Sequence, residues 1–302
     1  MPMIENADTH PLITVITPSY NGPYLIDAIK SVLMQTYPKI EYIIADDAST
    51  NFPEEEIRQL LSQNSGNVVS WQILRKAQNV GTVKNLNSAI RVSHGEYIFL
   101  LAHDDLLYDE DVLAGRVKFF QETGALATIG LAEAVSFDLT QSFGILPPER
   151  KRKNILSMSP KELLDDSWFV GNICGCAAAY SSDFFIISGY FDEKYLLLED
   201  APTFYRLLSQ NIHLYLWENF AVKYRLSPQD KKARYFTNFT YLKDRIFLIK
   251  DKLRYYEGIK KIVLMLELER VLLKCFLLHH NKKYALVLYY IETPFQFFIS
   301  KR

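Results

Sequence analysis

Adjacent acidic residues follow apolar runs at two distant places in the sequence. An apolar run that ends at Ala102 is followed by His103 and then by Asp104 and Asp105, and Glu199 and Asp200 come directly after three leucines. Carboxylate oxygens are the ligands that Mg²⁺ and Mn²⁺ prefer, and a positioned carboxylate can also take a proton from a reacting hydroxyl. The two pairs are therefore candidates for metal binding and for general-base catalysis.

Each of these features also has an ordinary structural explanation. An acidic pair after a strand often forms a turn, which applies equally to a third pair, Asp46 and Asp47. Gly81 can serve a loop that needs a positive φ, Tyr20 can be a buried aromatic residue, and Asp200 can lie at the start of a helix for its favourable dipole. The elements that surround these residues decide between the explanations.

The first third of the chain alternates between strand and helix patterns. Apolar and β-branched runs predict four strands, at residues 13–17, 40–45, 68–74 and 96–102. Helical spacing or an acidic first turn predicts a helix after each of Pro23, Pro53 and Gly81. This alternation predicts an α/β fold with a mostly parallel sheet and helices on both faces. In such sheets ligands bind beyond the carboxyl ends of the strands, where these polar residues would gather.

The middle of the chain is less regular. Residues 138–159, with two prolines and a run of four basic residues, predict a mobile loop, and Ser159 to Glu162 has the spacing of a capping box. The three leucines before Glu199 resemble a strand end, and a helix is predicted over 201–209. Two further strands are predicted at 213–217 and 220–224.

Composition places the chain among folded proteins. It has 302 residues, of which 49% are hydrophobic, and only three cysteines, too few for a disulfide framework. Its first residues lack the basic start and apolar middle of a secretory signal, so we expect a cytoplasmic protein with reduced cysteines. No apolar stretch is long enough to predict a membrane-spanning helix.

The net charge of -1 conceals two regions of opposite charge. Residues 1–228 carry 18 basic and 28 acidic residues, whereas residues 229–302 carry 16 basic and 7 acidic ones. We therefore predict a catalytic domain over 1–228 and a basic, aromatic-rich helical region over 229–302. That region either lies on an anionic membrane surface or packs against the catalytic domain or a second copy of the chain. Its charge is interleaved with too much apolar surface for nucleic-acid binding.

The order of the motifs resembles the family 2 glycosyltransferases. A strand ending in "TPSYN", a second ending in "DDAS", the loop "NVGTVKN", a strand ending in "HDD" and then "GYFDEKYLLLEDAPTFYRL" follow one another over about residues 11–225. The resemblance implies the GT-A fold, in which a nucleotide-binding sheet is joined to an acceptor-binding half.

The resemblance also implies which residues bind a nucleotide-sugar donor. Tyr20, in the segment that begins at Thr17, matches the position where an aromatic ring lies against the nucleobase, and Asp47 the position that reads the base edge, with Asp46 beside it. Lys84 would meet a phosphate as a point charge near a helix N-terminus.

The remaining roles concern the metal and the reaction. By resemblance Asp105 is the direct ligand of Mn²⁺ or Mg²⁺, and Asp104 contacts the ribose or the metal shell. His103 departs from the family, which often has a further acidic residue there. Asp200 matches the catalytic base, and Glu199 is assigned a structural or acceptor-contacting role. The metal would neutralise the charge of the departing diphosphate.

The predicted activity is inverting, metal-dependent transfer of a hexosyl or N-acetylhexosaminyl group from a nucleotide-sugar donor, with a UDP-sugar as the first choice. The predicted acceptor is a saccharide or lipid-linked saccharide at the inner face of a bacterial cytoplasmic membrane. Assembly of surface polysaccharide or lipopolysaccharide is the implied setting. The Gln-x-x-Arg-Trp motif of processive synthases is absent, and Tyr224-Arg225 lacks the histidine that many relatives have slightly later. The alternatives are a catalytically silent binding or scaffolding subunit and a sugar-nucleotide pyrophosphorylase.

Overall fold

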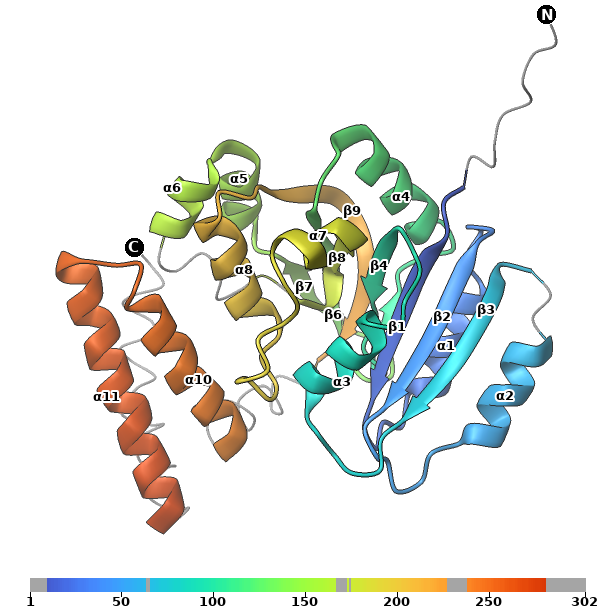
Figure 1. Ribbon diagram of the computed structural model, residues 1–302, viewed down its shortest axis with the longest axis horizontal. Coiled ribbons are helices and arrows are strands. Elements are labelled where there is room, and N and C mark those ends of the chain that lie inside the picture. The colour runs from blue at the N-terminus through green and yellow to red at the C-terminus, as the bar shows by residue number, and fades with distance from the viewer. Residues whose placement is uncertain (1–9, 64–65, 167–172, 174, 227–237, 281–302) are drawn as a thin grey trace, which may run out of the picture.

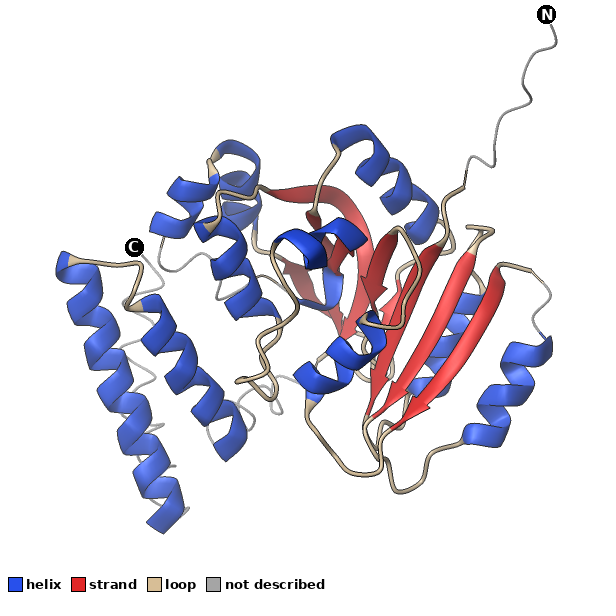
Figure 2. Ribbon diagram, viewed as in Figure 1, coloured by secondary structure: helices blue, strands red, loops and turns tan. Residues whose placement is uncertain are grey.

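The computed structural model describes residues 10–63, 66–166, 173, 175–226 and 238–280. Nine strands of these residues form one mixed sheet in the order β3-β2-β1-β4-β8-β6-β9-β5, and β7 pairs with β6 outside this path. Helices cover both faces of the sheet (Figures 1 and 2). The predicted fold class, a mostly parallel α/β sheet with flanking helices and a helical C-terminal extension, is confirmed.

The first four strands form the parallel half of the sheet. They are β1 (Ile13–Ser19), β2 (Ile40–Asp46), β3 (Val68–Arg75) and β4 (Tyr97–Leu100), and β1 pairs in parallel with β2 and β4 while β2 pairs with β3. The helices between them are α1 (Leu25–Leu33), α2 (Glu54–Gln63) and α3 (Thr82–Ile90). All of these elements lie where the sequence predicts them. Because Ser19 pairs with Asp46, and Asp46 with Arg75, the first three strands end at one level.

The second half of the sheet contains antiparallel pairs. Its strands are β5 (Leu106–Leu107), β6 (Ala127–Val135), β7 (Ser142–Leu146), β8 (Ala178–Ser181) and β9 (Leu214–Arg225). β8 lies antiparallel between β4 and β6, whereas β9 runs parallel to β6 and antiparallel to β5. The helices of this half are α4 (Val112–Thr123), α5 (Glu149–Ser157), α6 (Pro160–Asp165), α7 (Ser182–Ile187) and α8 (Asp200–Ser209).

Three predictions for this half are wrong. Residues 138–159 contain β7 and α5, because β7 pairs with β6 and the basic run forms the polar surface of a helix that buries only Ile155. The two predicted strands at 213–217 and 220–224 are the single strand β9, which continues alongside β6 past a register shift. The three leucines at 196–198 lie in a loop. The capping box at Ser159 and Glu162 is confirmed.

Two apolar clusters pack against the sheet. Alternation along β1 sends Ile13 and Val15 to one cluster with residues of α1, α2 and α4, and Ile16 to the other with residues of α3, α7 and α8. The second cluster continues into the C-terminal helices α10 (Phe239–Lys252) and α11 (Gly258–His280).

The C-terminal helices pack on the rest of the protein rather than apart from it. Leu242 and Ile249 of α10, with Leu264 and Val271 of α11, are buried in the same apolar cluster as the sheet. An ion pair between Arg245 and Glu267 joins α10 to α11, and α10 contacts α8 (Figure 1). None of the helices described is long and apolar enough to cross a membrane. Residues 281–302, which complete the predicted basic region, lie outside the described residues.

Candidate functional site

The ends of β1 and β2 form one edge of the site. Asp46, the last residue of β2, has no exposed surface, and its Oδ2 accepts hydrogen bonds from Ser49 N at 3.1 Å and Arg75 Nε at 3.2 Å. Asn21, after β1, reaches the same turn, because its Oδ1 accepts from Thr50 N at 2.9 Å. The loops after the two strands are therefore held together by hydrogen bonds.

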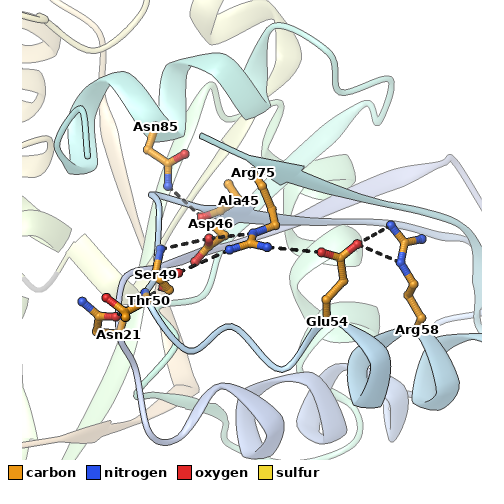
Figure 3. A network of polar contacts seen from close by, with 9 residues as sticks. All are labelled: Asn21, Ala45, Asp46, Ser49, Thr50, Glu54, Arg58, Arg75 and Asn85. Atoms are coloured by element: carbon orange, nitrogen blue, oxygen red, sulfur yellow. Dashed lines mark hydrogen bonds and ion pairs between the residues drawn. The ribbon is translucent and has the colours of Figure 1, made fainter. Parts of the chain in front are cut away.

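Figure 3 shows how this network continues to the surface of α2. Arg75 also forms an ion pair with Glu54 at 3.4 Å, and Glu54 in turn binds Arg58 at 2.7 Å. The outer members are partly exposed, so they contribute little to the free energy of unfolding. The inner pair of Asp46 and Arg75 fixes the turn that presents the next residue, Asp47.

Asp47 anchors the loop that leads into α3. Its Oδ1 accepts from Val80 N at 2.8 Å, and its Oδ2 accepts from Gly81 N at 2.9 Å. The carboxylate is buried, yet two oxygens offer about four acceptor positions, so lone pairs remain for a ligand. Asp47 therefore does serve as a loop anchor, and the predicted contact to the edge of a nucleobase would use the lone pairs that remain.

The other predicted donor residues differ in accessibility. Thr17 is fully buried, and its hydroxyl lies 2.9 Å from the hydroxyl of Tyr42. Tyr20 is 49% exposed at the end of β1, which excludes the explanation that it is a core residue. Lys84 is exposed in the first turn of α3. Tyr20 and Lys84 thus present reachable side chains, whereas Thr17 supports the strand from inside.

The acidic pair after β4 is divided between surface and interior. Asp104 is half-buried, whereas Asp105 is fully buried and accepts a hydrogen bond from Arg225 N at 3.0 Å. Burial, and then the charge of Asp104, raise the pKa of Asp105 well above its usual value, although a hydrogen bond from Cys176 acts in the opposite direction. The two carboxylates therefore repel each other at close range.

Arg225 is a site residue that the sequence reasoning missed. Its Nη1 donates to the carbonyl of Asp104 at 3.1 Å, its Nε donates to the carbonyl of Phe137, and its Nη2 binds Asp27 at 2.8 Å. The guanidinium also lies 4.3 Å from the ring centroid of Tyr24. No local pattern marks Arg225, because its partners come from three separate segments of the chain.

His103 packs against the first loop. A Cβ atom on Gly22 would come within 1.8 Å of the His103 ring, so only glycine fits beside this imidazole. The loop after β1 and the loop after β4 are therefore in direct contact. This arrangement places Tyr20 and Asp104 on neighbouring loops.

The second acidic pair begins α8. Ala201 N donates to Asp200 Oδ1 at 2.6 Å, and Gly175 N–H also binds the Asp200 carboxylate. Burial raises the pKa of Asp200, and burial together with the charges of Asp200 and Asp244 raises that of Glu199. A raised pKa suits a group that must take up a proton near neutral pH.

Two consecutive residues connect the acidic pairs. Gly175 lies against Asp200, where a Cβ atom would come within 2.9 Å of Oδ2, and the thiol of the next residue, Cys176, binds Asp105. The structure thus brings together the carboxylates that follow β4 and those that begin α8. No cluster of three or more metal-ligating side chains occurs within the described part of the chain.

The donor chemistry of the pair fits a divalent cation. Asp104 and Asp105 offer oxygen atoms, and a cation beside them would relieve the repulsion that raises the pKa of Asp105. Mg²⁺ in nucleotide sites is commonly held by one or two carboxylates, with substrate phosphates and water at the other positions. A pair of carboxylates therefore suffices for such an ion.

Comparison with known proteins identifies the family. The profile of the family described as Glycosyl transferase family 2 matches residues 14–186, which include all but the first residue of β1, the acidic pair after β4, and β8. The chain belongs to glycosyltransferase family 2. The predicted resemblance is thereby confirmed.

Several curated relatives of this family 2 protein come from bacteria. The chain is 32% identical over 120 residues to the glycosyltransferase GlyG of Streptococcus pneumoniae, covering 39% of this chain and 38% of that protein. It is 28% identical over 167 residues to the putative teichuronic acid biosynthesis glycosyltransferase TuaG of Bacillus subtilis, covering 55% and 60%. The chain thus spans about two fifths to three fifths of the length of these relatives.

Solved structures share the fold at low sequence identity. Residues 1–349 of TarS from S. aureus superpose with a TM-score of 0.60 at 17% identity, covering 89% of this chain and 71% of that one. The mannosyltransferase PcManGT from Pyrobaculum calidifontis, in complex with GDP-Man and Mn²⁺, gives 0.59 at 19% identity, covering 92% and 73%. These likenesses support the GT-A-like architecture of the family 2 chain.

Proposed function

We propose that this family 2 glycosyltransferase transfers one sugar per visit from a nucleotide-sugar donor to a saccharide acceptor, with inversion at the anomeric carbon. The observation that carries the proposal is the contact of Gly175 and Cys176 with Asp200 and Asp105. A base for the acceptor and carboxylates for the donor diphosphate are thereby brought to one place. A binding or scaffolding subunit needs no such arrangement.

The proposed reaction is a single displacement. The acceptor hydroxyl attacks the anomeric carbon, the bond from that carbon to the diphosphate oxygen breaks, and the leaving diphosphate keeps the electron pair. Asp200 takes the hydroxyl proton, for which its raised pKa suits it. Attack opposite the leaving group inverts the anomeric carbon, so no covalent sugar-enzyme bond is formed. Glu199 shares this half-buried position without a proton-transfer role.

Asp104 and Asp105 are the proposed holders of Mn²⁺ or Mg²⁺. When bound, the cation would neutralise charge on the diphosphate. Asp105 was predicted as the direct ligand, but the greater exposure of Asp104 favours it as the carboxylate that an incoming donor meets first. The binding of Mn²⁺ with GDP-Man by PcManGT supports the presence of a cation.

We propose a UDP-sugar as the donor, with a hexosyl or N-acetylhexosaminyl group to be transferred. TarS residues 1–349 have been solved with UDP and with UDP-GlcNAc, which supports this choice, and the GDP-Man complex of PcManGT marks the main alternative. Tyr20 would lie against the nucleobase, and Asp47 and Asp46 would contact the edge of the nucleobase. Thr17 would support β1 from inside, and Lys84 would face a phosphate group.

The proposed acceptor is a cell-surface polymer precursor, either a saccharide or a lipid-linked saccharide. The similarity to TuaG supports a cell-wall polymer over lipopolysaccharide. Lipid-linked acceptors are met at the cytoplasmic membrane, and α11 has a surface suited to a lipid interface. Apolar residues 45–81% exposed lie on that helix, namely Ile259, Ile262, Met265, Leu266, Leu272, Leu273 and Phe276.

Donor binding is tested by calorimetry with UDP and Mn²⁺ on the wild type, Asp104→Ala and Asp105→Ala. We expect both substitutions to remove metal-dependent binding, while Glu110→Ala, an exposed acidic residue in the same segment, leaves it unchanged. Unchanged affinity in folded Asp104→Ala and Asp105→Ala proteins would show that the cation site lies elsewhere. Incubation with a panel of UDP- and GDP-sugars then identifies the donor by release of nucleotide.

Membrane binding is tested by sedimentation with anionic vesicles. Leu266→Glu combined with Leu273→Glu changes the exposed side of α11 without touching the buried Leu264 and Val271. We expect the double variant to remain in solution, while Val69→Glu, at an exposed apolar position on β3, sediments as the wild type does. If the wild type ignores vesicles but forms a dimer that the double variant lacks, this surface binds a second copy of the chain.

A further inference from the structure

A buried carboxylate on α10 binds the loop that leads to the proposed catalytic base. Asp244 is 1% exposed, and its Oδ2 accepts from the backbone N–H groups of Leu196 at 3.0 Å, Leu197 at 2.7 Å and Leu198 at 3.1 Å. Its Oδ1 also accepts from Leu196 N at 3.1 Å. Three consecutive backbone donors therefore converge on one side chain, two residues before Asp200.

The burial of the Asp244 carboxylate has a cost in free energy. Removing a carboxylate from water costs several kcal/mol, and convergent N–H donors are what offset that cost. Asp244 lies 46 to 48 residues after the loop and outside the segment matched by the family profile, 14–186. The contact therefore serves the conformation of residues 196–198 rather than the chemistry directly.

The same loop also touches the donor side of the site. Leu196 O accepts from Val83 N at 3.3 Å, and a Cβ atom on Gly81 would lie only 2.9 Å from this oxygen. Gly81 N is in turn bound by Asp47. A continuous series of contacts thus runs from Asp47 through the loop before α3 to Leu196, and from there to Asp244.

A second carboxylate of α10 binds the preceding residues. Asp251 Oδ2 accepts from the hydroxyl of Tyr195 at 2.6 Å and pairs with Lys194 at 2.6 Å. Two turns of one helix therefore hold the segment before Asp200 along its length. Of these two carboxylates, only Asp244 accepts hydrogen bonds from the backbone of that segment, whereas Asp251 binds side chains.

We propose that Asp244 is a positioning residue for Asp200. It fixes the backbone of residues 196–198, so that the carboxylate at the start of α8 is aligned with the acceptor hydroxyl while Leu196 keeps contact with the donor loop. This inference rests on the proposed function of Asp200 as base. It gives the C-terminal helices a part in the reaction besides any surface role.

The test compares Asp244→Asn with the wild type. Asparagine has nearly the same shape but carries no charge and replaces one acceptor oxygen by a donor group, so its hydrogen bonds to the three N–H groups are weaker and the Leu196 N–H loses its second acceptor, Oδ1. We expect kcat for sugar transfer to fall about 10- to 100-fold, because small displacements of a catalytic group have effects of this size. The Kd for UDP with Mn²⁺ should stay within about twofold. Amide hydrogen exchange at 196–198 should become faster, whereas exchange in β1 should not change.

The matched control is Glu257→Gln, which removes the same charge from an exposed residue between α10 and α11 and should leave kcat and amide exchange unchanged. If Asp244→Asn does not fold, Asp244→Glu keeps the charge but displaces the carboxylate, and the same loss of kcat at constant donor Kd is expected. A wild type that transfers no sugar refutes the proposed function. Normal wild-type transfer with unchanged kcat or unchanged exchange at 196–198 in the variant overturns the positioning role, as does an equal loss of donor affinity and kcat.

Discussion

The donor side and the acceptor side of the site hold their carboxylates by different means. Asp46 and Asp47 are bound by groups no more than 34 residues away, which belong to the same or the next β-α unit of the parallel sheet. On the acceptor side, the loop before Asp200 is bound by a residue of the C-terminal helices, and Asp105, which lies between the two sides, is bound by Arg225, 120 residues later. The donor side is thus assembled locally, whereas the acceptor side depends on distant segments, so disturbances should spread further there.

The largest expected effect is a loss of kcat on the acceptor side that leaves donor binding unchanged. Asp200→Asn should lower kcat about 100-fold or more while the Kd for UDP with Mn²⁺ stays unchanged, because the base is lost but the donor contacts remain. Steady-state kinetics and calorimetry measure the two quantities. The control is Asp183→Asn, an exposed acidic residue in the first turn of α7. Loss of donor binding in Asp200→Asn would contradict the separation of the two sides, because a change on the acceptor side would then also disturb the donor side.

Arg225→Met tests how far a disturbance spreads. It leaves the Asp104 and Phe137 carbonyls and the Asp27 carboxylate without a partner, so the free energy of unfolding should fall by about 3 kcal/mol. Metal-dependent UDP binding should weaken as well, because Asp104 loses its support.

The matched control for this prediction is Arg58→Met on the donor side. Its ion pair with Glu54 is exposed, so the change in unfolding free energy should be within about 0.5 kcal/mol. Urea denaturation measures both variants. Equal effects of the two substitutions would contradict the idea that the long-range contacts of Arg225 matter more than the local contacts of the donor side.

The pH dependence of the reaction sharpens the contrast further. Burial raises the pKa of Asp200, and a base works only when ionised, so kcat should fall as the pH drops through this raised value rather than near the usual pKa of an aspartate. Glu199→Gln should leave this acidic limb in place, because the charge of Asp200 helps to raise the pKa of Glu199 to about 8, so that Glu199 is still neutral when Asp200 takes up its proton. Profiles of kcat from pH 4 to 9 measure both variants. An acidic limb that Glu199→Gln moves to lower pH would show that Glu199 is ionised before Asp200.

The smallest expected effect lies on the donor side. Ala48, after Asp47, has a φ of 66°, a left-handed conformation that costs a non-glycine residue about 1 to 2 kcal/mol. Ala48→Gly should relieve this strain and raise the free energy of unfolding by no more than about 1 kcal/mol, since glycine also gains entropy in the unfolded chain. Thermal unfolding measures the change, with Ala114→Gly in the α4 helix as a control that should destabilise.

The donor half could be predicted from sequence because its signals are local. The strand and helix patterns around Asp46, Asp47 and Asp104 are complete within single β-α units, and the structure places each element as expected. β7 was missed because a strand at an exposed edge, with glycine and serine, carries little hydrophobic pattern. β9 was divided because Glu218 and Asn219 look like a turn, whereas pairing with β6 carries the strand through them.

The sequence indicated candidate site residues but not the contacts that hold them in place. The order of the motifs pointed to both acidic pairs, whose neighbourhood the structure confirms through Gly175 and Cys176. Arg225 and Asp244 have no local signature, since each acts on a segment at least 46 residues away in the chain. The roles of the individual donor residues stay predictions.

The position of Asp244 has a consequence for how the protein is made. During synthesis, β1 to β4 leave the ribosome first, and with them all partners of Asp46 and Asp47, so the donor side can fold while translation continues. The loop before Asp200 gains its anchor only when α10 has emerged. In a nascent chain the loops at the ends of β1 and β2 can therefore become ordered before the loop that leads to Asp200, and a protein cut short before α10 would lack the anchor of that loop.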